Sequence, residues 1–354
     1  MWPAEKVTQA LGIHFPIIQA PMAGVTTPEL VAAVSNAGGL GSLGAGYMRA
    51  EDIKQSIKKI RVLTDKPFAV NLFIPGKYYA TAEQTQQVCE LIQQSCVELN
   101  IKINPVTEPY LSSFEEQLSV IVKERVPIFS FTFGIPDPSW IAHLKSNGIV
   151  LIGTATTLTE AHALEEQGID MVVAQGSEAG GHRGTFLGPV ENALINTQSL
   201  LSQIVNQIKI PIIAAGGIMN GQGIVDALRL GAQAVQLGTA FLSCPESGIH
   251  PAYKQALLTM DWDNTVLTRA FSGKLARGIK NKFIARMDAH QAHILDYPIQ
   301  NALTRDMRKE ADKQSNIDFM SLWAGQSARL SRGISAAQLM HQLVSEVEAR
   351  FETK

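Results

Sequence analysis

The chain has 354 residues with 30 basic and 32 acidic side chains, and this near balance excludes the strongly basic surface of a nucleic-acid-binding or membrane-docking protein. Its three cysteines form no C-x-x-C pair, which argues against a disulfide framework and fits a reducing compartment. No run of about 18 apolar residues is present and the N-terminus lacks a secretory pattern, so we expect a cytoplasmic protein without a membrane span.

Eight short apolar runs recur along the chain and predict strands. Most are apolar on both faces, which indicates parallel strands covered by helices. Proline opens four of them, where its missing N–H costs a strand least. The predicted strands are Ile17–Met22, Leu40–Gly44, Phe68–Phe73, Ile128–Phe133, Ile149–Thr154, Met171–Gln175, Ile212–Gly216 and Ala234–Gly238.

Helical patterns fill most of the intervals between these runs. Pro28–Ala37, Thr159–Gln167 and Ile224–Leu230 each carry apolar residues three and four positions apart, as on one face of a helix. Glycines such as Gly38 precede several strands and permit the left-handed backbone that ends a helix. Repeated strand–helix units form either a doubly wound sheet or a closed barrel. Eight units favour an α/β fold of the (β/α)8 TIM barrel type, which we assign to residues 1–243.

Two parts of the chain depart from this alternation. Some fifty residues separate Ile74 from Val126 and include a Gln-rich helical stretch, Glu83–Glu98, so we expect two helices and a loop over the barrel mouth. Residues 244–332 show no further strand pattern and are predicted to form an appended helical subdomain or lid. The amphipathic pattern in residues 333–354 predicts a last helix that packs back on the barrel.

The segment Ala174–Thr185, with the sequence AQGSEAGGHRGT, is the main candidate site. Its four glycines let the backbone bend sharply and approach a ligand closely. His182 is the side chain in this flexible, exposed loop that suits proton transfer near neutral pH. Loops at the carboxyl ends of barrel strands build active sites, so we interpret this loop as an active-site rim. A surface turn with an incidental histidine is the alternative.

Other strand ends carry groups that suit a phosphorylated ligand. Gly216 ends the seventh predicted strand and Gly217 follows it, while Gln236–Thr239 lies at the end of the eighth. Glycine-rich turns after these two strands commonly bind phosphate through backbone N–H groups in this fold. Tight turns that bind no ligand would have the same glycine-rich sequence. Asn71, within the apolar third strand, is expected to hydrogen-bond either a ligand or a neighbouring loop. Gln175 ends the sixth strand.

The chain shows no pattern for covalent or metal chemistry. It has no G-x-S-x-G motif, no Cys/His cluster with metal-ligand spacing and no lysine at a strand end suited to a Schiff base. No metal site is therefore predicted. Because one histidine does little beyond proton transfer, a bound cofactor should carry the chemistry.

The sequence resembles the nitronate monooxygenase family, the former 2-nitropropane dioxygenases, over nearly its whole length. The segments that carry the resemblance are Pro16–Ala23, Val70–Phe73, Phe129–Gly134, Ala174–Gly184, Ala214–Gly217, Gln236–Thr239 and Ser321–Gln326. This resemblance implies an FMN-dependent (β/α)8 barrel that oxidises alkyl nitronates with molecular oxygen.

The resemblance also implies roles for single residues. His182 is implied to be the catalytic base, and the residues implied to contact FMN are Asn71, Gln175, Gly180, Gly217, Gln236, Leu237, Gly238 and Thr239, the last four around its phosphate. The family's substrates include the toxin propionate 3-nitronate, which implies a detoxifying role with a small-molecule nitronate and O2 as partners. No oligomeric state follows from the sequence.

Two other functions fit parts of the pattern. FMN-dependent enoyl-acyl-carrier-protein reductases, which use NAD(P)H, share the opening strand, the EAGGH loop and the Gly-Gly turn. Phe129–Gly134 and Ser321–Gln326 favour nitronate oxidation over this reductase. A flavin-free barrel isomerase or lyase that binds a sugar phosphate would use the same phosphate turns.

The segment Lys274–Asn281 leaves several roles open. Arg277 and Asn281 are expected either to line the pocket or to lie on a solvated helix face. For Lys274 and Lys280 the solvated helix face is the favoured interpretation.

Overall fold

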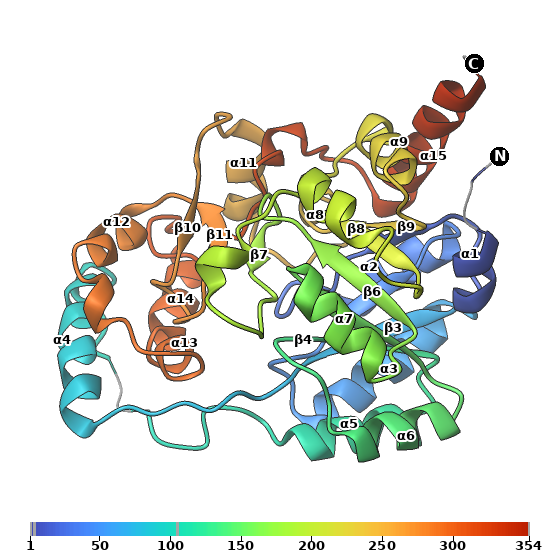
Figure 1. The fold of residues 1–354 in the computed structure, drawn as a ribbon. Coiled ribbons are helices and arrows are strands. Elements are labelled where there is room, and N and C mark those ends of the chain that lie inside the picture. The colour runs from blue at the N-terminus through green and yellow to red at the C-terminus, as the bar shows by residue number, and fades with distance from the viewer. Residues whose placement is uncertain (1, 3–4, 104–105, 353–354) are drawn as a thin grey trace.

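The computed structural model describes residues 2, 5–103 and 106–352. Eight parallel strands alternate with helices in a nearly closed barrel, which confirms the predicted (β/α)8 architecture (Figure 1). The barrel strands are β1 (Ile17–Gln19), β2 (Gly41–Gly44), β3 (Phe68–Phe73), β4 (Ile128–Thr132), β5 (Val150–Ala155), β6 (Met171–Gln175), β8 (Ile212–Ala215) and β9 (Ala234–Leu237). They pair in the order β1-β9-β8-β6-β5-β4-β3-β2, and a parallel bridge from Ile18 to Leu40 brings the two end strands together.

Helices cover the outside of the barrel. They are α2 (Pro28–Asn36), α3 (Ala50–Leu63), α5 (Phe114–Lys123), α6 (Pro138–Ser146), α7 (Leu158–Glu166), α8 (Thr197–Ile204), α9 (Gly221–Arg229) and α15 (Ala336–Glu352). Local capping starts several of them; before α2, the Thr27 hydroxyl accepts the N–H of Leu30 and proline takes the first helical position. The last helix, α15, packs against α9 and α2. No helix within the described residues is long and apolar enough to cross a membrane.

Two hydrophobic layers hold the barrel together. The inner layer includes Ile18, Ile128 and Ile152 and is joined by two residues of α1 (Glu5–Leu11). The outer layer, between strands and helices, includes Val70 and Phe129. Burial on both faces explains why the strands read as continuous apolar runs rather than alternating ones.

A second hydrophobic core joins α4 (Ala82–Glu98) to the C-terminal addition. Figure 1 shows α4 beside the addition, and Glu98 forms ion pairs of 2.5 Å with both Lys282 and Arg286. Of the two helices expected between Ile74 and Val126, α5 therefore covers the barrel and α4 packs with the addition. The short helix α10 (Thr239–Leu242) follows β9. The helices of the addition are α11 (Pro251–Thr259), α12 (Lys282–Asp288), α13 (Ile299–Leu303), α14 (Arg305–Lys313), and the 3-10 helices η2 (Gln291–His293) and η3 (Ala328–Leu330).

The addition is not purely helical, which corrects the expectation for residues 244–332. It contains β10 (Thr265–Thr268) and β11 (Ala276–Ile279), which form a three-stranded antiparallel sheet with β7 (Gly181–His182) from the barrel. These strands have four residues or fewer and lack an apolar run, so periodicity gave no signal for them. The 3-10 helix η1 (Val190–Ala193) follows β7.

Candidate active site

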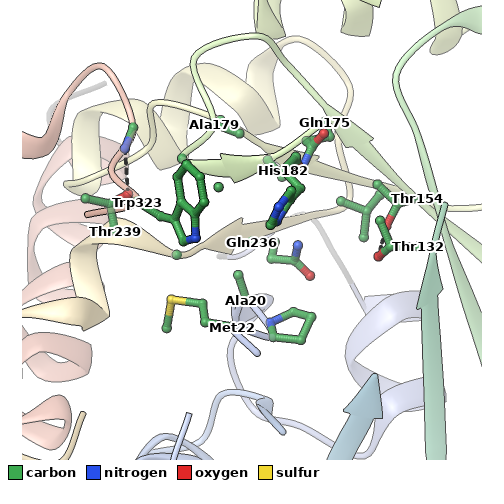
Figure 2. Close-up of a pocket in the computed structure, with 18 of the residues that line it drawn as sticks. Ala20, Met22, Thr132, Thr154, Gln175, Ala179, His182, Gln236, Thr239 and Trp323 are labelled. Atoms are coloured by element: carbon green, nitrogen blue, oxygen red, sulfur yellow. Dashed lines mark hydrogen bonds between the residues drawn. The ribbon is translucent and has the colours of Figure 1, made fainter. Parts of the chain in front are cut away.

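A cavity lies at the carboxyl ends of the barrel strands, between the barrel and the addition. In Figure 2, His182 and Trp323 lie on one side of the cavity, Met22 lies on the opposite side, and Gln236 stands between them. Tyr253 of the addition also lines it. Residues far apart in the sequence therefore build one site, as expected at this end of a parallel barrel.

The cavity gathers nearly all the site residues that the sequence indicated. His182 lines it, and so do seven of the eight residues implied to contact FMN: Asn71, Gln175, Gly180, Gly217, Gln236, Gly238 and Thr239. The exception is Leu237, whose side chain is 1% exposed and belongs to the outer core layer. Side chains alternate along a strand, so Gln236 takes the cavity side and leaves Leu237 with its backbone alone near a ligand.

The turns after β8 and β9 present free backbone donors to this cavity. Gly216 and Gly217 have φ angles of 126° and 71°, in the region that favours glycine. Among the described residues, the backbone N–H groups of Gly217, Ile218 and Thr239 have no acceptor. Unpaired donors at two neighbouring turns suit an anion such as phosphate.

Two amide side chains that were expected to meet a ligand also have partners within the protein. Gln175 donates from Nε2 to the carbonyl oxygen of His182 (3.1 Å), and its Oε1 accepts the N–H of Gly184 (2.8 Å). This amide therefore braces the segment that carries the histidine. Asn71 donates from Nδ2 to the hydroxyl of Ser130 (3.0 Å) and also lines the cavity. It therefore has a partner within the protein and also lies where a ligand would bind.

His182 lies on a short strand rather than in the flexible, exposed loop that its glycine-rich surroundings predicted. Its strand, β7, pairs with β11, where Ala276 is the partner of His182. The ring centroids of Trp323 and Phe133 lie 5.2 and 6.0 Å from that of the imidazole. The addition thus fixes the position of the histidine through contacts that the loop sequence alone does not specify.

The environment of His182 keeps its imidazole neutral. Burial, together with the smaller effects of the charges on Lys274 and Arg308, lowers the pKa of His182 from 6.5 to about 3. The neutral ring has an unprotonated lone pair at pH 7, and the lowered pKa makes it a weaker base than free imidazole. It carries no charge that would attract an anionic substrate, so such attraction has to come from other groups.

The hydroxyl of Ser272 forms a hydrogen bond with this imidazole. The Ser272 hydroxyl is buried and lies 2.8 Å from Nε2 of His182. The hydroxyl has one proton, and the carbonyl oxygen of Lys274 (3.1 Å) can accept it, which leaves the hydroxyl oxygen to accept a proton from Nε2. We therefore assign the proton to Nε2, which leaves Nδ1 as the basic nitrogen.

Replacing Ser272 by Ala should remove the hydrogen bond that favours the Nε2-protonated form of His182. If His182 is the base that the family resemblance implies, kcat/KM for a neutral nitroalkane should fall by about tenfold, the loss of one hydrogen bond, with less effect on a preformed nitronate that needs no proton removal. Steady-state kinetics on both substrate forms measures this, and nitrogen NMR of the histidines reports the tautomer directly. Ser202→Ala, which removes an exposed hydroxyl from α8, is the control. Equal losses on both substrate forms would contradict a role in orienting the base.

The buried guanidinium of Arg183, the residue after His182, anchors the same segment. It is 1% exposed and donates to the carbonyl oxygens of Gly176 (2.5 Å), Gln175 (2.9 Å) and Ala193 (2.9 Å). Burial lowers the pKa of Arg183 to about 10, so it remains charged at neutral pH. One side chain thus holds two consecutive carbonyls at the end of β6 and the carbonyl of Ala193 in η1.

The open roles in Lys274–Asn281 are resolved, because this segment forms β11 and its flanks rather than a helix. Arg277 is buried and donates from Nε to the carbonyl oxygen of Ser177, while Asn281 caps α12. Neither lines the cavity. For Lys274 the solvated helix face is wrong, because its Nζ lies 4.4 Å from the Phe133 ring centroid and donates to the carbonyl oxygen of Thr185.

Several residues around the cavity were not identified from the sequence. Ser272 contacts His182 across ninety positions of chain, and Tyr47 reaches the cavity from the loop after β2. Isolated hydroxyl residues of this kind give no pattern in a single sequence. Among the described residues, no group of three or more His, Cys, Asp or Glu side chains is arranged to hold a metal ion.

Comparison with known proteins identifies the relatives of this chain. The sequence profile of the family described as Nitronate monooxygenase matches residues 4–346. A probable nitronate monooxygenase of Staphylococcus haemolyticus (strain JCSC1435) is 47% identical over 350 residues, covering 98% of each chain. Another from Staphylococcus aureus (strain N315) is 44% identical over 360 residues and covers both chains completely.

Solved structures point the same way. Nitroalkane oxidase from Streptomyces ansochromogenes superposes with a TM-score of 0.91 at 40% identity, over 98% of this chain and 99% of that chain. FabK from Thermotoga maritima is more distant, with a TM-score of 0.78 at 31% identity over 98% and 97% of the two chains. The match of profile, sequence and structure over nearly the whole length establishes that this chain belongs to the nitronate monooxygenase family.

Proposed function

We propose that this enzyme holds FMN and oxidises alkyl nitronates of the propionate 3-nitronate type with O2. The observation that carries the proposal is a neutral histidine that shares one cavity with two turns of free backbone donors. Such an activity would remove toxic nitronates. We place it in the cytoplasm, a reducing compartment that suits the free thiols of Cys89, Cys96 and Cys244.

The residues of the cavity fit FMN. The N–H groups of Gly217, Ile218 and Thr239 would hold its phosphate, and the amides of Asn71 and Gln236 would hydrogen-bond its ring system. When bound, the flavin would supply the electron-accepting chemistry that the side chains lack. No redox-active metal site is needed for this scheme.

The protein's own contribution is proton transfer in a dry site. When a neutral nitroalkane binds, Nδ1 of His182 takes the proton from the carbon beside the nitro group. Ser272 keeps the other nitrogen protonated, while Trp323 and Phe133 cover the imidazole and keep water away. A preformed nitronate has already lost this proton and needs binding and orientation alone.

The test is spectroscopic and kinetic. The purified protein, supplemented with FMN, should show a flavin spectrum and consume O2 when ethylnitronate is added. NADH alone should leave the spectrum unchanged. A protein that takes up no flavin would contradict the proposal and favour a flavin-free isomerase or lyase.

An enoyl-acyl-carrier-protein reductase is the second candidate, and the similarity to FabK supports it. The greater similarity to nitroalkane oxidase supports the first. Bleaching of the flavin by NADH, with consumption of NADH in the presence of a crotonyl thioester, would reverse the order of the two.

A further inference from the structure

The segment Ser321–Gln326, which we call the bridging segment, contacts three parts of the site: β11, the loop after β6 and the turn after β9. Its residue Trp323 forms an antiparallel bridge with Gly278 of β11. At its end, the backbone N–H of Gln326 donates to the carbonyl oxygen of Glu178 in the loop after β6 (3.0 Å). The bridging segment therefore ties the addition to the barrel close to the segment that carries the histidine.

Two glycines let the bridging segment lie directly on the loop that leads to His182. A Cβ atom on Gly180 would lie 2.5 Å from the backbone nitrogen of Gly325. A Cβ atom on Gly325 would lie 2.8 Å from the carbonyl oxygen of Glu178. Side chains at these positions would push the two backbones apart, so glycine is required at both. Because the two backbones are in direct contact, a shift of the bridging segment displaces the loop as well.

Trp323 extends this contact to the base. Its indole centroid lies 5.2 Å from that of the His182 imidazole, and in Figure 2 the indole stands between His182 and Thr239. The hydroxyl of Tyr253 donates to the backbone carbonyl oxygen of Trp323, and the ring of Phe271 meets the indole at 86° with centroids 5.7 Å apart. Both the backbone and the ring of Trp323 are therefore held, and its indole forms one wall beside the imidazole.

Thr239 connects the bridging segment to the turn after β9 and still has two free donors. Its hydroxyl oxygen accepts the N–H of Gly325 (3.0 Å), a contact across 86 positions of chain. Within the described part of the chain, neither the hydroxyl proton nor the backbone N–H of Thr239 has an acceptor, and the residue lines the cavity. A hydroxyl that donates its proton to an anion becomes a better acceptor, because hydrogen bonds in a chain polarise one another. An anion bound to Thr239 would therefore strengthen the bond to Gly325.

We propose that Thr239 is a positioning residue that couples the anion site after β9 to the base through the bridging segment. When Thr239 donates to the phosphate of bound FMN, its hydroxyl oxygen holds Gly325 more tightly, and Trp323 stays packed beside the imidazole of His182. Without an anion, the bond at Gly325 is weaker and the imidazole is less firmly placed. This inference rests on the proposed nitronate oxidation with FMN and adds the residues that connect the phosphate site to the base.

Hydrogen exchange at two neighbouring backbone amides tests the coupling, and NMR of the isotope-labelled protein resolves them. In the wild type, FMN should slow exchange at Gly325 by about tenfold more than at Ala324, whose N–H donates to the carbonyl oxygen of Arg277 (3.2 Å) and is the reference in the same segment. Thr239→Ser keeps the hydroxyl and should behave as the wild type. Thr239→Val keeps the shape and the backbone N–H but has no hydroxyl, so the difference between the two amides should disappear.

Kinetics at saturating FMN gives a second readout. Thr239→Val should lower kcat/KM about threefold to tenfold more for nitroethane, whose proton the base removes, than for ethylnitronate, which has already lost that proton. Thr239→Ser should restore most of the wild-type ratio between the two substrates. Thr259→Val, which removes an exposed hydroxyl from α11, is the matched control and should leave the ratio and both exchange rates unchanged.

The outcomes separate the coupling from the function on which it rests. If the wild type takes up no FMN or does not oxidise ethylnitronate, the proposed function fails. If it does both, while FMN protects Gly325 and Ala324 equally or Thr239→Val keeps the wild-type ratio, the function stands and the coupling is wrong. If Thr239→Val binds no FMN at all, or needs more FMN but shows an unchanged ratio at saturation, the hydroxyl is a phosphate ligand alone, which also overturns the proposal.

Discussion

Replacing His182 by Asn should lower kcat/KM for a neutral nitroalkane by about 10²–10⁴-fold, the usual contribution of a positioned general base. His182 is the imidazole that lines the cavity, and its environment keeps it unprotonated at neutral pH. Asparagine is close in size and polar, so the cavity should keep its shape. Stopped assays with nitroethane at pH 7 measure the loss.

The same variant should lose much less activity on a preformed nitronate, because that substrate needs no base. This comparison is the internal control, since damage to the flavin site would lower both activities together. Full activity of His182→Asn on nitroethane would rule out the assignment of the base.

The low pKa of His182 also predicts a pH dependence of stability. Burial, the largest cause, lowers its pKa in the folded protein to about 3, whereas in the unfolded chain it returns to 6.5. Below pH 6.5 the unfolded state therefore binds a proton that the folded state does not, and the free energy of unfolding falls as the pH drops from about 6.5 towards 3. The slope from this one residue is at most about 1.4 kcal/mol per pH unit. Urea unfolding of wild type and His182→Asn at pH 7 and 5 should show a smaller decrease in the variant.

The barrel could be predicted because burial on both faces leaves a strong signal. Its eight strands appear in the sequence as apolar runs, and all eight occur in the structure. The strand ends differ from the prediction: the first predicted strand is Ile17–Met22, whereas β1 ends at Gln19 and residues 20–22 line the cavity. Those residues are apolar because of the cavity, so hydrophobic pattern alone assigned them to the strand.

The candidate site was predicted where its residues follow barrel strands and missed where the addition supplies them. The glycine turns and His182 sit at positions that the fold itself makes functional. Ser272 comes from an irregular segment of the addition and contacts His182 across ninety positions of chain. Such pairings arise from tertiary packing and have no local periodicity, so a single sequence does not reveal them.

Replacing Arg183 by Met should be the most destabilising single change near the site. Methionine keeps the length of the side chain but removes every donor, so the carbonyl groups of Gln175, Gly176 and Ala193 lose a charged partner in a buried position. Nearby Glu160 and Glu178 also lose a compensating charge. Removing one partner from a buried charged network typically costs about 3–5 kcal/mol, and we expect a loss of that order in urea unfolding.

Arg183→Met should lower the activity as well as the stability, because Arg183 and Gln175 hold the segment that carries His182. Arg183→Lys keeps the charge but places its donors at a single point, so it should recover part of the stability and less of the activity on nitroethane. Arg49→Met, at a side chain that is 78% exposed, is the control and should unfold at the same urea concentration as the wild type. If Arg183→Met unfolds there too, the buried guanidinium does not support the segment, and the position of His182 depends on the pairing of β7 with β11 instead.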